Sequence, residues 1–448
     1  MKPTIDMRAF KECDIRGVYG TEMNERIAYG VGRAVAAQAR EVCVAGDVRL
    51  STPELKRALL RGLLEGGAAV TDLGVIPTPV FYYAKHVLGI AGGVMVTASH
   101  NPPQYNGLKL MIGDLPVTPE DMAKLAEQVR AWDFPEGRGT LRFYDVMPQY
   151  LGMIREAFRV KGKLRVVVDA GNGTTAWSAP AALAAIGCEV VPLYCWPDGR
   201  FPNRDPNPAV YAHLRDLQKR VREVGADMGV AFDGDGDRAV FVDDAGEVVQ
   251  SEEALALMMR RALREPSSVV YDLKSSSVVK RTAEALGSEA IMERSGHAFI
   301  KRTFLQHNSA LAGEISGHFF FRELGHDDGT YAACYLASLV AERGWKLSAE
   351  RQKLPHTVIT PDLRLPWPYE RQQEVIDGMM AFGEQYPVTT LDGVRVDFPE
   401  GWLLVRKSVT EAKITLRMEA EDQAGIAAIK ERLLQRLPEL RGLHEQLQ

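Results

Sequence analysis

The stretch "VCVAGDVRLSTPELKRALLRGLLEGGAAVTDLG", residues 42–74, decides the fold that we predict for this chain. It begins with an apolar run typical of a buried strand, continues through a polar loop, and then shows the spacing of an amphipathic helix. Glycines end the helical pattern, and a second strand-like run follows. Because two strands joined through a helix form a βαβ unit, this stretch predicts a parallel sheet.

The same order of elements occurs twice more along the chain. Residues 166–193 read "VVVDAGNGTTAWSAPAALAAIGCEVVPL", and residues 269–294 read "VVYDLKSSSVVKRTAEALGSEAIMER". The three copies begin at Val42, Val166 and Val269, so they are separated by 124 and 103 residues. These intervals are too long and too unequal for a solenoid, and they indicate three separate domains of similar architecture.

The sequence changes character in its last quarter. Helices are expected near 369–386 and 424–437, and between them lie three strand-like runs, "GVRVDF", "WLLVRK" and "KITLRME", which together favour a small α+β domain. The predicted fold class is therefore α/β, with three similar mixed α/β domains of βαβ-type units and a smaller C-terminal α+β domain around a central cleft. We expect a hinge at 363–370, where two prolines interrupt the chain, and domains at residues 1–147, 148–248, 249–363 and 364–448.

Composition limits the classes of function that the chain can have. Of its 448 residues, 46% are hydrophobic and 25% are charged, as in ordinary globular proteins. The net charge of −5 predicts no nucleic-acid partner, and no run reaches the roughly 18 apolar residues of a membrane helix, so no membrane partner is predicted. No secretory signal is recognisable in "MKPTIDMRAF", and the five cysteines include no CxxC pair. We therefore expect a cytoplasmic protein with reduced cysteines.

Each of the three copies ends with a strand, a polar loop and another strand. The loops lie within "GGVMVTASHNPPQYNGLKLM" (92–111), "MGVAFDGDGDRAVFVDD" (228–244) and "ALAGEISGHFFF" (310–321). In open α/β sheets, ligands bind outside the carboxyl ends of the strands. We therefore expect the three loops to meet in one cleft.

The second loop carries Asp233, Asp235 and Asp237 at a spacing of two residues, which directs three carboxylates to the same side of an extended chain. Such carboxylates repel one another unless a cation neutralises them, and their hard oxygens favour Mg²⁺ or Ca²⁺. An EF-hand is excluded, because Arg238 occupies its glycine position and Asp244 occupies its final glutamate position. The alternative is a solvated acidic turn. Since Mg²⁺ commonly completes its shell with phosphate oxygens, the loop favours phosphoryl chemistry.

"TASHNP", "DGDGDR" and "GEISGH", in this order, resemble the signature loops of the α-D-phosphohexomutase superfamily. Within it the chain most resembles the bacterial phosphomannomutase/phosphoglucomutase group, whose third loop reads Gly-Glu-Met-Ser-Gly-His; here Ile315 stands in the place of Met. The likeness covers essentially the whole chain, including "CDIRGVYG" near the start and a basic loop near the end.

The resemblance implies a phosphoserine enzyme that interconverts hexose 1-phosphates and hexose 6-phosphates of mannose, glucose or both. Ser99 would carry the phosphoryl group, and Mg²⁺ would be held by Ser99, Asp233, Asp235 and Asp237. A hexose 1,6-bisphosphate would serve as intermediate and activator, and small sugar phosphates would be the partners of a monomer or weak homodimer. The alternatives are a phosphoglucosamine mutase, a simple phosphatase, and a non-catalytic sugar-phosphate-binding relative.

The resemblance also assigns roles to single residues. Two arginines suit a bidentate grip on the reacting phosphoryl group, a lysine stabilises it, one histidine orients Ser99, and another acts as general acid or base. The expected catalytic residues are Ser99, His100, Arg16, Lys109, Arg238 and His318. The expected substrate-binding residues are Glu314, Ser316, His297, Lys274, Arg406, Ser408 and Thr410.

Glu314 and Ser316 are expected to hold two adjacent sugar hydroxyls, and Arg406, Ser408 and Thr410 the phosphate that is not transferred. The sequence departs from the family pattern in the last loop, at Cys13, and in "GRFPNRDPNP" (199–208), which lacks a histidine often found there. Val409 and Ala412 replace the usual Asn and Pro of the last loop, and Cys13 replaces a common Tyr. One side-chain donor to the phosphate is therefore missing from that loop.

Overall fold

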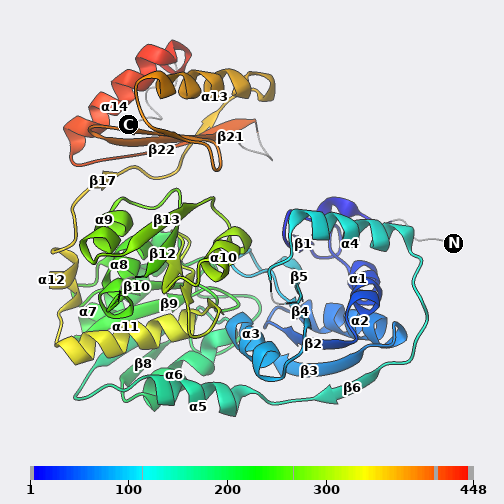
Figure 1. The fold of residues 1–448 in the computed structure, drawn as a ribbon. Coiled ribbons are helices and arrows are strands. Elements are labelled where there is room, and N and C mark those ends of the chain that lie inside the picture. The colour runs from blue at the N-terminus through cyan, green and yellow to red at the C-terminus, as the bar shows by residue number, and fades with distance from the viewer. Residues whose placement is uncertain (1–4, 114, 266, 408–411, 442–448) are drawn as a thin grey trace.

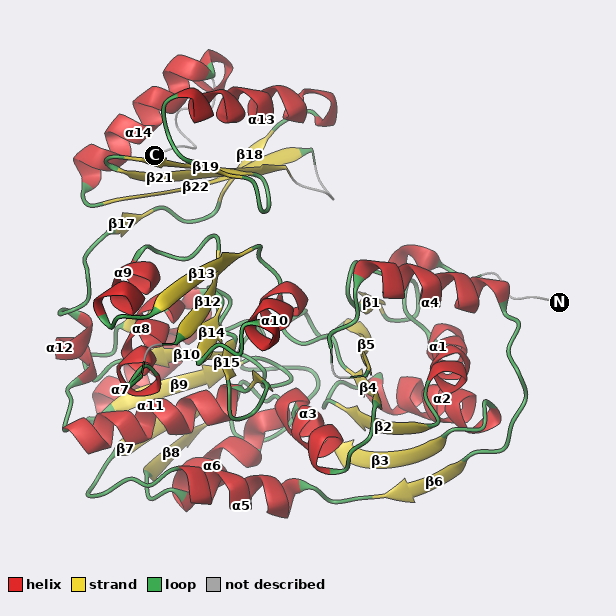
Figure 2. Cartoon of the chain, in the orientation of Figure 1, coloured by secondary structure: helices red, strands yellow, loops and turns green. Residues whose placement is uncertain are grey.

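The computed structural model describes residues 5–113, 115–265, 267–407 and 412–441. Figure 1 shows four domains in succession along the chain, with the first (blue to cyan) on the right of the view and the last (orange to red) above the third. In Figure 2 helices and strands alternate through the first three domains, whereas the last domain stacks its helices over one sheet. Within the described residues, no helix combines the length and the apolar character needed to span a membrane.

The first domain is built on a six-stranded sheet in which β5 is antiparallel to its neighbours β1 and β4, and the remaining pairs are parallel. In spatial order its strands are β1 (Ile15–Val18), β5 (Tyr105–Ile112), β4 (Gly92–Val96), β2 (Glu41–Gly46), β3 (Ala69–Val75) and β6 (Thr140–Phe143). Its helices are η1 (Met7–Ala9), α1 (Glu25–Gln38), α2 (Thr52–Glu65), α3 (Thr78–Val87) and α4 (Pro119–Ala131).

The second and third domains each have a five-stranded mixed sheet. The second consists of β11 (Val248–Val249), β10 (Ala239–Val242), β9 (Met228–Phe232), β7 (Arg165–Asp169) and β8 (Glu189–Leu193), with α5 (Met147–Ala157), η2 (Thr174–Ala176), α6 (Ser178–Ala185), η3 (Tyr211–Leu214) and α7 (Arg215–Val224). The third consists of β13 (Glu289–Glu293), β12 (Ser268–Asp272), β14 (Leu311–Gly313), β15 (Phe319–Phe321) and β16 (His326–Asp327), with α8 (Ser251–Ala262), α9 (Val278–Ala285), α10 (His297–Gln306), α11 (Gly329–Arg343) and α12 (Leu347–Arg351).

The three domains share one strand order. In each, the first strand of the βαβ unit lies between the second and the third strands, all three are parallel, and a fourth strand runs antiparallel beside the third. The polar loops connect the third strand to the fourth, as β4–β5, β9–β10 and β14–β15. The predicted fold class of three similar α/β domains is confirmed.

A continuous apolar core joins these domains. It includes Phe81 of α3, Ile154 of α5, Leu183 of α6 and Leu336 of α11, all fully buried or nearly so. The first domain has a second core on the other face of its sheet, under α1, α2 and α4. Since protein interiors are close-packed, the shared core fixes the three loops relative to one another.

The fourth domain is an antiparallel sheet with its own apolar core beneath two helices. Its strands are β17 (Val358–Ile359), β22 (Lys413–Ala420), β21 (Gly401–Lys407), β20 (Val394–Phe398) and β19 (Val388–Thr389), and β18 (Leu363–Pro366) also pairs with β22. Its helices are η4 (Tyr369–Arg371), α13 (Gln372–Met380), η5 (Ala381–Glu384) and α14 (Gln423–Arg436). The predicted α+β character of this region is confirmed.

The stretch predicted as a hinge, 363–370, begins with strand β18, and the predicted boundary between 363 and 364 passes through that strand. Leu363 pairs with Leu416 and Pro366 pairs with Lys413, so β18 is an integral part of the fourth sheet. Pro366 fits there because it ends a short strand, where its missing N–H removes no ladder bond. The segment between α12 and β17, residues 352–357, lies outside the sheets on both sides.

Candidate active site

The three polar loops border one cleft of about 300 Å³. Its lining includes Ser99 of the first loop, Asp237 and Arg238 of the second, and His318 of the third. Arg16, Lys109 and His297, also expected from the sequence as site residues, line the same cleft. The structure therefore brings together residues that are up to 302 positions apart in the chain, from Arg16 to His318.

Ser99 lies just beyond the end of β4 in a left-handed backbone conformation, with φ of 50°. Its side chain is nearly buried, at 2% exposure, and Oγ donates a hydrogen bond to Oδ2 of Asp233 over 2.7 Å. Nδ1 of His100 lies 3.3 Å from the same Oγ. A non-glycine residue takes up this conformation only where its surroundings impose it. The loop therefore holds the Ser99 hydroxyl against the carboxylate of another domain.

Arg49 anchors the loop that carries Ser99 by hydrogen bonds to its backbone, and the sequence analysis did not identify this arginine. Its guanidinium is 1% exposed and donates to the carbonyls of Ser99 (2.7 Å), Asn101 (2.6 Å), Pro102 (2.7 Å) and Tyr105 (3.0 Å). It also donates to Asp47 at 3.1 Å, so its charge is balanced. No sequence signal distinguishes Arg49 from the other basic residues, because its partners lie about 50 positions away.

The aspartates of the second loop are completely buried, with carboxylate oxygens within 4.8 Å of one another. Lys109 donates to Oδ2 of Asp235 at 2.8 Å and to Oδ2 of Asp237, and Thr78 donates to Asp235 at 2.6 Å. Oδ1 of Asp235 and Oδ1 of Asp237 are buried and have no hydrogen-bond partner. Gly234 permits the close approach of this loop to the first, since a Cβ there would lie 2.5 Å from the carbonyl oxygen of Ser99.

The charges of this loop are only partly balanced. Burial, together with repulsion from Asp237 and Asp235, raises the pKa of Asp233 well above its usual range. Burial also disfavours ionised Asp237, but Lys109 and His318 outweigh it and lower the pKa. Burial alone would lower the pKa of Lys109, yet Asp235 and Asp237 raise it well above its usual range. Three carboxylates with two unpartnered oxygens and one ammonium fit a hard divalent cation.

Two arginines face the cleft beside Ser99. Arg16 donates to Asn101 at 2.7 Å and to Asp14 at 2.5 Å, and Nε of Arg238 donates to Nε2 of His318 over 3.1 Å. Burial, followed by the charges of Arg238 and Arg16, lowers the pKa of His100 far below its usual value, so its imidazole is neutral. The surroundings of Ser99 are therefore cationic on the side of the cleft, which suits an anionic ligand.

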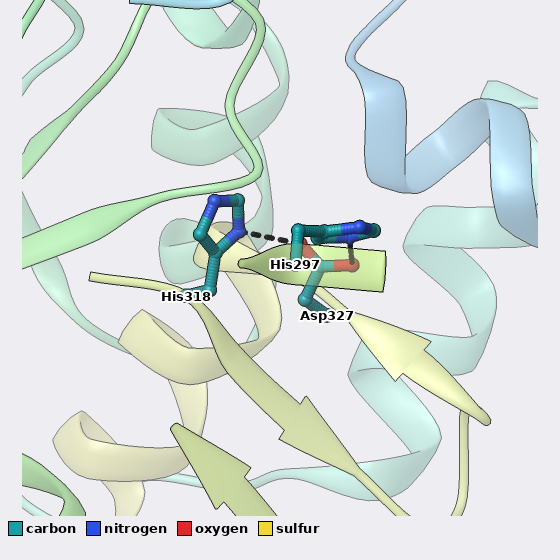
Figure 3. Close-up of side chains that lie close together, drawn as sticks. All are labelled: His297, His318 and Asp327. Carbon is teal, nitrogen blue, oxygen red and sulfur yellow. Dashed lines mark hydrogen bonds and ion pairs between the residues drawn. The ribbon is translucent and has the colours of Figure 1, made fainter. Parts of the chain in front are cut away.

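His297 and His318 share one carboxylate, Asp327, which the sequence analysis also missed. Figure 3 shows both imidazoles turned toward Asp327, with Nε2 of His297 2.8 Å from Oδ1 and Nδ1 of His318 2.7 Å from Oδ2. Burial lowers the pKa of His318, but Asp237 and Asp327 outweigh it and raise the pKa above its usual value. The contact from Arg238 instead requires a lone pair on Nε2. Nε2 of His318 therefore carries no proton, because a guanidinium N–H can only donate a hydrogen bond.

The third loop is held together by its own side chains. Oε1 of Glu314 accepts a hydrogen bond from the backbone N–H of Gly296 at 2.8 Å, and the Ser316 hydroxyl donates to Oε2 over 3.1 Å. Oε2 of Glu314 also lies 3.8 Å from Nε2 of His318. Glu314 and Ser316 are therefore next to the histidine that lines the cleft.

The remaining expected residues are elsewhere. Lys274 forms an ion pair with Asp362 at 2.6 Å, and Arg406 pairs with Asp392. Neither Lys274 nor Arg406 is among the described residues that line the cleft. Ser408 and Thr410 lie outside the described residues, as does Val409. Cys13 does line the cleft, where burial raises the pKa of its thiol to about 11.

Comparisons with known proteins found matches to one family along most of the chain. Four domains described as Phosphoglucomutase/phosphomannomutase match in order: alpha/beta/alpha domains I, II and III at residues 7–136, 148–246 and 250–358, and the C-terminal domain at 366–436. The chain belongs to the phosphoglucomutase/phosphomannomutase family. The resemblance inferred from its three loops is thereby confirmed.

The names of the relatives of this chain refer to different sugars. A phosphomannomutase/phosphoglucomutase of Pseudomonas aeruginosa is 37% identical over 439 residues, covering 96% of this chain and 95% of that protein. A protein of Methanocella arvoryzae named "Probable phosphoglucosamine mutase" is 34% identical, covering 93% and 95%. A crystal structure of a phosphoglucomutase/phosphomannomutase family protein from Burkholderia thailandensis has a TM-score of 0.90 at 35% identity, covering 96% and 98%.

Arg49→Lys is expected to lower the free energy of unfolding by about 3 kcal/mol, because a lysine cannot reach the four carbonyls and leaves buried acceptors without donors. Urea unfolding measures the loss, and amide hydrogen exchange should rise across residues 97–104. Arg57→Lys, at an exposed arginine of the next helix, is the control and should change stability by less than about 0.5 kcal/mol. Equal stability and exchange in the Arg49 variant and the unsubstituted protein would contradict this role.

Proposed function

We propose that this family member interconverts hexose 1-phosphates and hexose 6-phosphates, of mannose, glucose or both, through a phosphoserine at Ser99. The supporting observation is the position of the Ser99 hydroxyl, 2.7 Å from one of three buried carboxylates and facing a cleft lined by cations. A serine that accepts and returns a phosphoryl group needs these two neighbours, because phosphoryl transfer depends on positioning and on neutralising oxygen charge. The intermediate is a hexose 1,6-bisphosphate, which also serves as activator by phosphorylating Ser99.

The chain's own cations stabilise the phosphoryl group in this proposal. Arg16 and Arg238 turn from their present partners to its oxygens, and Lys109, already beside Asp235 and Asp237, contributes a fixed positive charge. Asp233, Asp235 and Asp237, with a phosphate oxygen on Ser99, would hold Mg²⁺, which would neutralise further phosphate charge. His100 stays neutral and orients the Ser99 side chain.

The sugar hydroxyl that attacks the phosphoryl group must lose its proton. His318 is the general base that we propose, since it lines the cleft and its Nε2 is the atom that would receive the proton once Arg238 turns to phosphate. His297, Glu314 and Ser316 contact the sugar hydroxyls in this proposal. The low exposure of Ser99 keeps water from the phosphoserine and favours transfer to sugar over simple hydrolysis.

The phosphate that is not transferred is assigned to Lys274, Arg406, Ser408 and Thr410. Lys274 and Arg406 lie on the third and fourth domains and are paired with Asp362 and Asp392. For both to reach a ligand in the cleft, the fourth domain must close over it, as active-site lids do. Sugar phosphates are the partners that we propose, for a monomer or weak homodimer in the cytoplasm, where its five free cysteines stay reduced.

Ser99→Ala is expected to lower turnover of a hexose 1-phosphate by more than about 1,000-fold, since no other group replaces a covalent nucleophile. Intact-mass spectrometry should find one phosphate on part of the unsubstituted protein and none on the variant. Ser295→Ala, at a second serine of the cleft, is the control and should keep both the phosphate and most of the turnover. Substantial mutase activity in Ser99→Ala would overturn the proposed function.

Removal of divalent cations is expected to abolish turnover, and added Mg²⁺ should restore it. Asp237→Asn should raise the Mg²⁺ concentration that gives half-maximal turnover by about tenfold or more, because it removes one ligand of the site. Asp244→Asn, in the turn that follows β10 and outside the carboxylate cluster, is the matched control and should leave this concentration unchanged. Full activity after exhaustive chelation would refute a metal-assisted reaction.

Mannose 1-phosphate and glucose 1-phosphate are expected to react with kcat/KM values within about tenfold of each other. The two sugars differ at O2, whereas Glu314 and Ser316 are proposed to hold O3 and O4. Rates on these two and on glucosamine 1-phosphate, with and without a hexose 1,6-bisphosphate, measure the preference. A clear preference for glucosamine 1-phosphate would favour the alternative function of a phosphoglucosamine mutase. The relative from Methanocella arvoryzae carries that name.

A further inference from the structure

Asp327 is a buried carboxylate with two imidazoles on its two oxygens. It lies in β16 at 0% exposure, and its backbone position is fixed by pairing with Phe320 of β15. Oδ1 faces Nε2 of His297 at 2.8 Å, and Oδ2 faces Nδ1 of His318 at 2.7 Å. Burial raises the pKa of Asp327, but His297 and His318 outweigh it and hold the pKa well below its usual range, so the group is ionised.

An ionised carboxylate only accepts hydrogen bonds, which settles where both histidines carry a proton. His297 donates from Nε2, and His318 donates from Nδ1. The other nitrogen of His318, Nε2, accepts from Arg238 at 3.1 Å. We infer that Asp327 is a positioning residue that sets the tautomers of His297 and His318 together, so that each ring keeps a lone pair on its other nitrogen for the substrate.

Two histidines and a carboxylate within 4.8 Å of one another are also a donor set that divalent transition metals use. The contact with Arg238 argues against that use. If Nδ1 of His318 bound a metal, its ring proton would have to be on Nε2, where it would meet the N–H of Arg238. Lys301, whose charge also acts on Asp327, adds a second cation close by. The geometry therefore favours hydrogen bonding over a metal centre.

The surroundings of the pair support a positioning role. His297 contacts the rings of Tyr82 and Phe320, and its centroid lies 5.1 Å from that of His318, so neither ring is free to turn without disturbing its neighbours. Asp237 lies 3.8 Å from Nδ1 of His318, and Glu314 lies 3.8 Å from Nε2. One of these carboxylates favours a proton on Nδ1 and the other favours a proton on Nε2, so a third group must select the tautomer. Asp327, at 2.7 Å from Nδ1, is the closest.

This inference rests on the proposed function for its effect on rate, because it prepares Nε2 of His318 to receive the proton of the sugar hydroxyl. A ring in the opposite tautomer would present an N–H to that hydroxyl and leave it without a base. The tautomers themselves do not depend on any reaction. They are a property of the resting protein and are measured separately.

The test compares Asp327→Asn with the unsubstituted protein, both labelled with ¹⁵N-histidine. An asparagine offers one acceptor oxygen and one NH₂ donor, so only one histidine keeps its N–H contact and the other must expose a lone pair to the amide. Long-range ¹H–¹⁵N spectra at mildly alkaline pH should show His297 protonated at Nε2 and His318 at Nδ1, with one of the two changed in the variant. His297→Gln and His318→Gln assign the signals.

Turnover provides the second readout, with kcat expected to fall by about 100-fold in Asp327→Asn while KM changes little. Asp328→Asn is the matched control: Asp328 is the next residue, is equally buried, and bonds Tyr150 at 2.8 Å and the backbone of α11 instead of a histidine. It should lose stability in urea unfolding without changing either tautomer. Far-UV circular dichroism confirms that both variants are folded.

Three results would overturn the inference. One is a His318 signal from an Nε2–H tautomer in the unsubstituted protein, and another is an Asp327→Asn variant with unchanged tautomers and unchanged kcat. The third is one equivalent of Zn²⁺ bound in saturating Mg²⁺ and lost in Asp327→Asn, which would establish a metal centre. If no sugar phosphate is converted but the tautomers are as stated, the proposed function fails and the positioning of the two rings stands.

Discussion

The arrangement of this molecule depends on three buried carboxyl groups that lie close together. Two carboxylates 4 Å apart repel by about 4 kcal/mol at the effective dielectric of a protein interior, so a loop carrying three of them cannot be buried without compensation. The compensation comes from another domain: Lys109 and Thr78 contact Asp235, and Ser99 contacts Asp233. The backbone N–H of Thr78 also donates to the carbonyl of Asp235 at 2.9 Å. The interface between the first two domains is thus part of the candidate active site.

Much of this site was predictable because its chemistry is written in short, local patterns. The alternation of Asp with Gly at 233–237 predicts carboxylates on one side of a flexible chain. The repeated βαβ order predicts that each polar loop lies at the carboxyl end of a strand. Arg49 and Asp327 were not predictable, since their roles depend on partners in other loops. The guanidinium of Arg49 recognises backbone carbonyls, which every residue type has, so no pattern of side chains could reveal it.

The strand within 363–370 was not predictable for a similar physical reason. Two prolines near Trp367 indicated an interruption, but a proline at the end of a short strand costs no ladder bond, and β18 pairs fully with β22. The positions of Lys274 and Arg406 also escaped prediction. The ion pair of Lys274 with Asp362 depends on how the fourth domain sits on the third, and that of Arg406 with Asp392 depends on the hairpin geometry inside the fourth domain; sequence periodicity describes neither.

The interface of the fourth domain differs in kind from those of the other three. Where α3, α5, α6 and α11 pack in one apolar core, the fourth domain meets the third largely through polar groups. Glu419 accepts from the Ser276 hydroxyl at 2.5 Å and from the Ser277 N–H at 2.8 Å, and the apolar contact is small, centred on Leu273, Trp402 and Leu404. Because hydrogen bonds exchange with water at little net cost whereas an opened apolar core is costly, this interface would open at a lower free-energy cost than the core shared by the first three domains. The fold therefore separates three domains joined by one packed apolar core from a fourth domain that is held mainly by polar contacts.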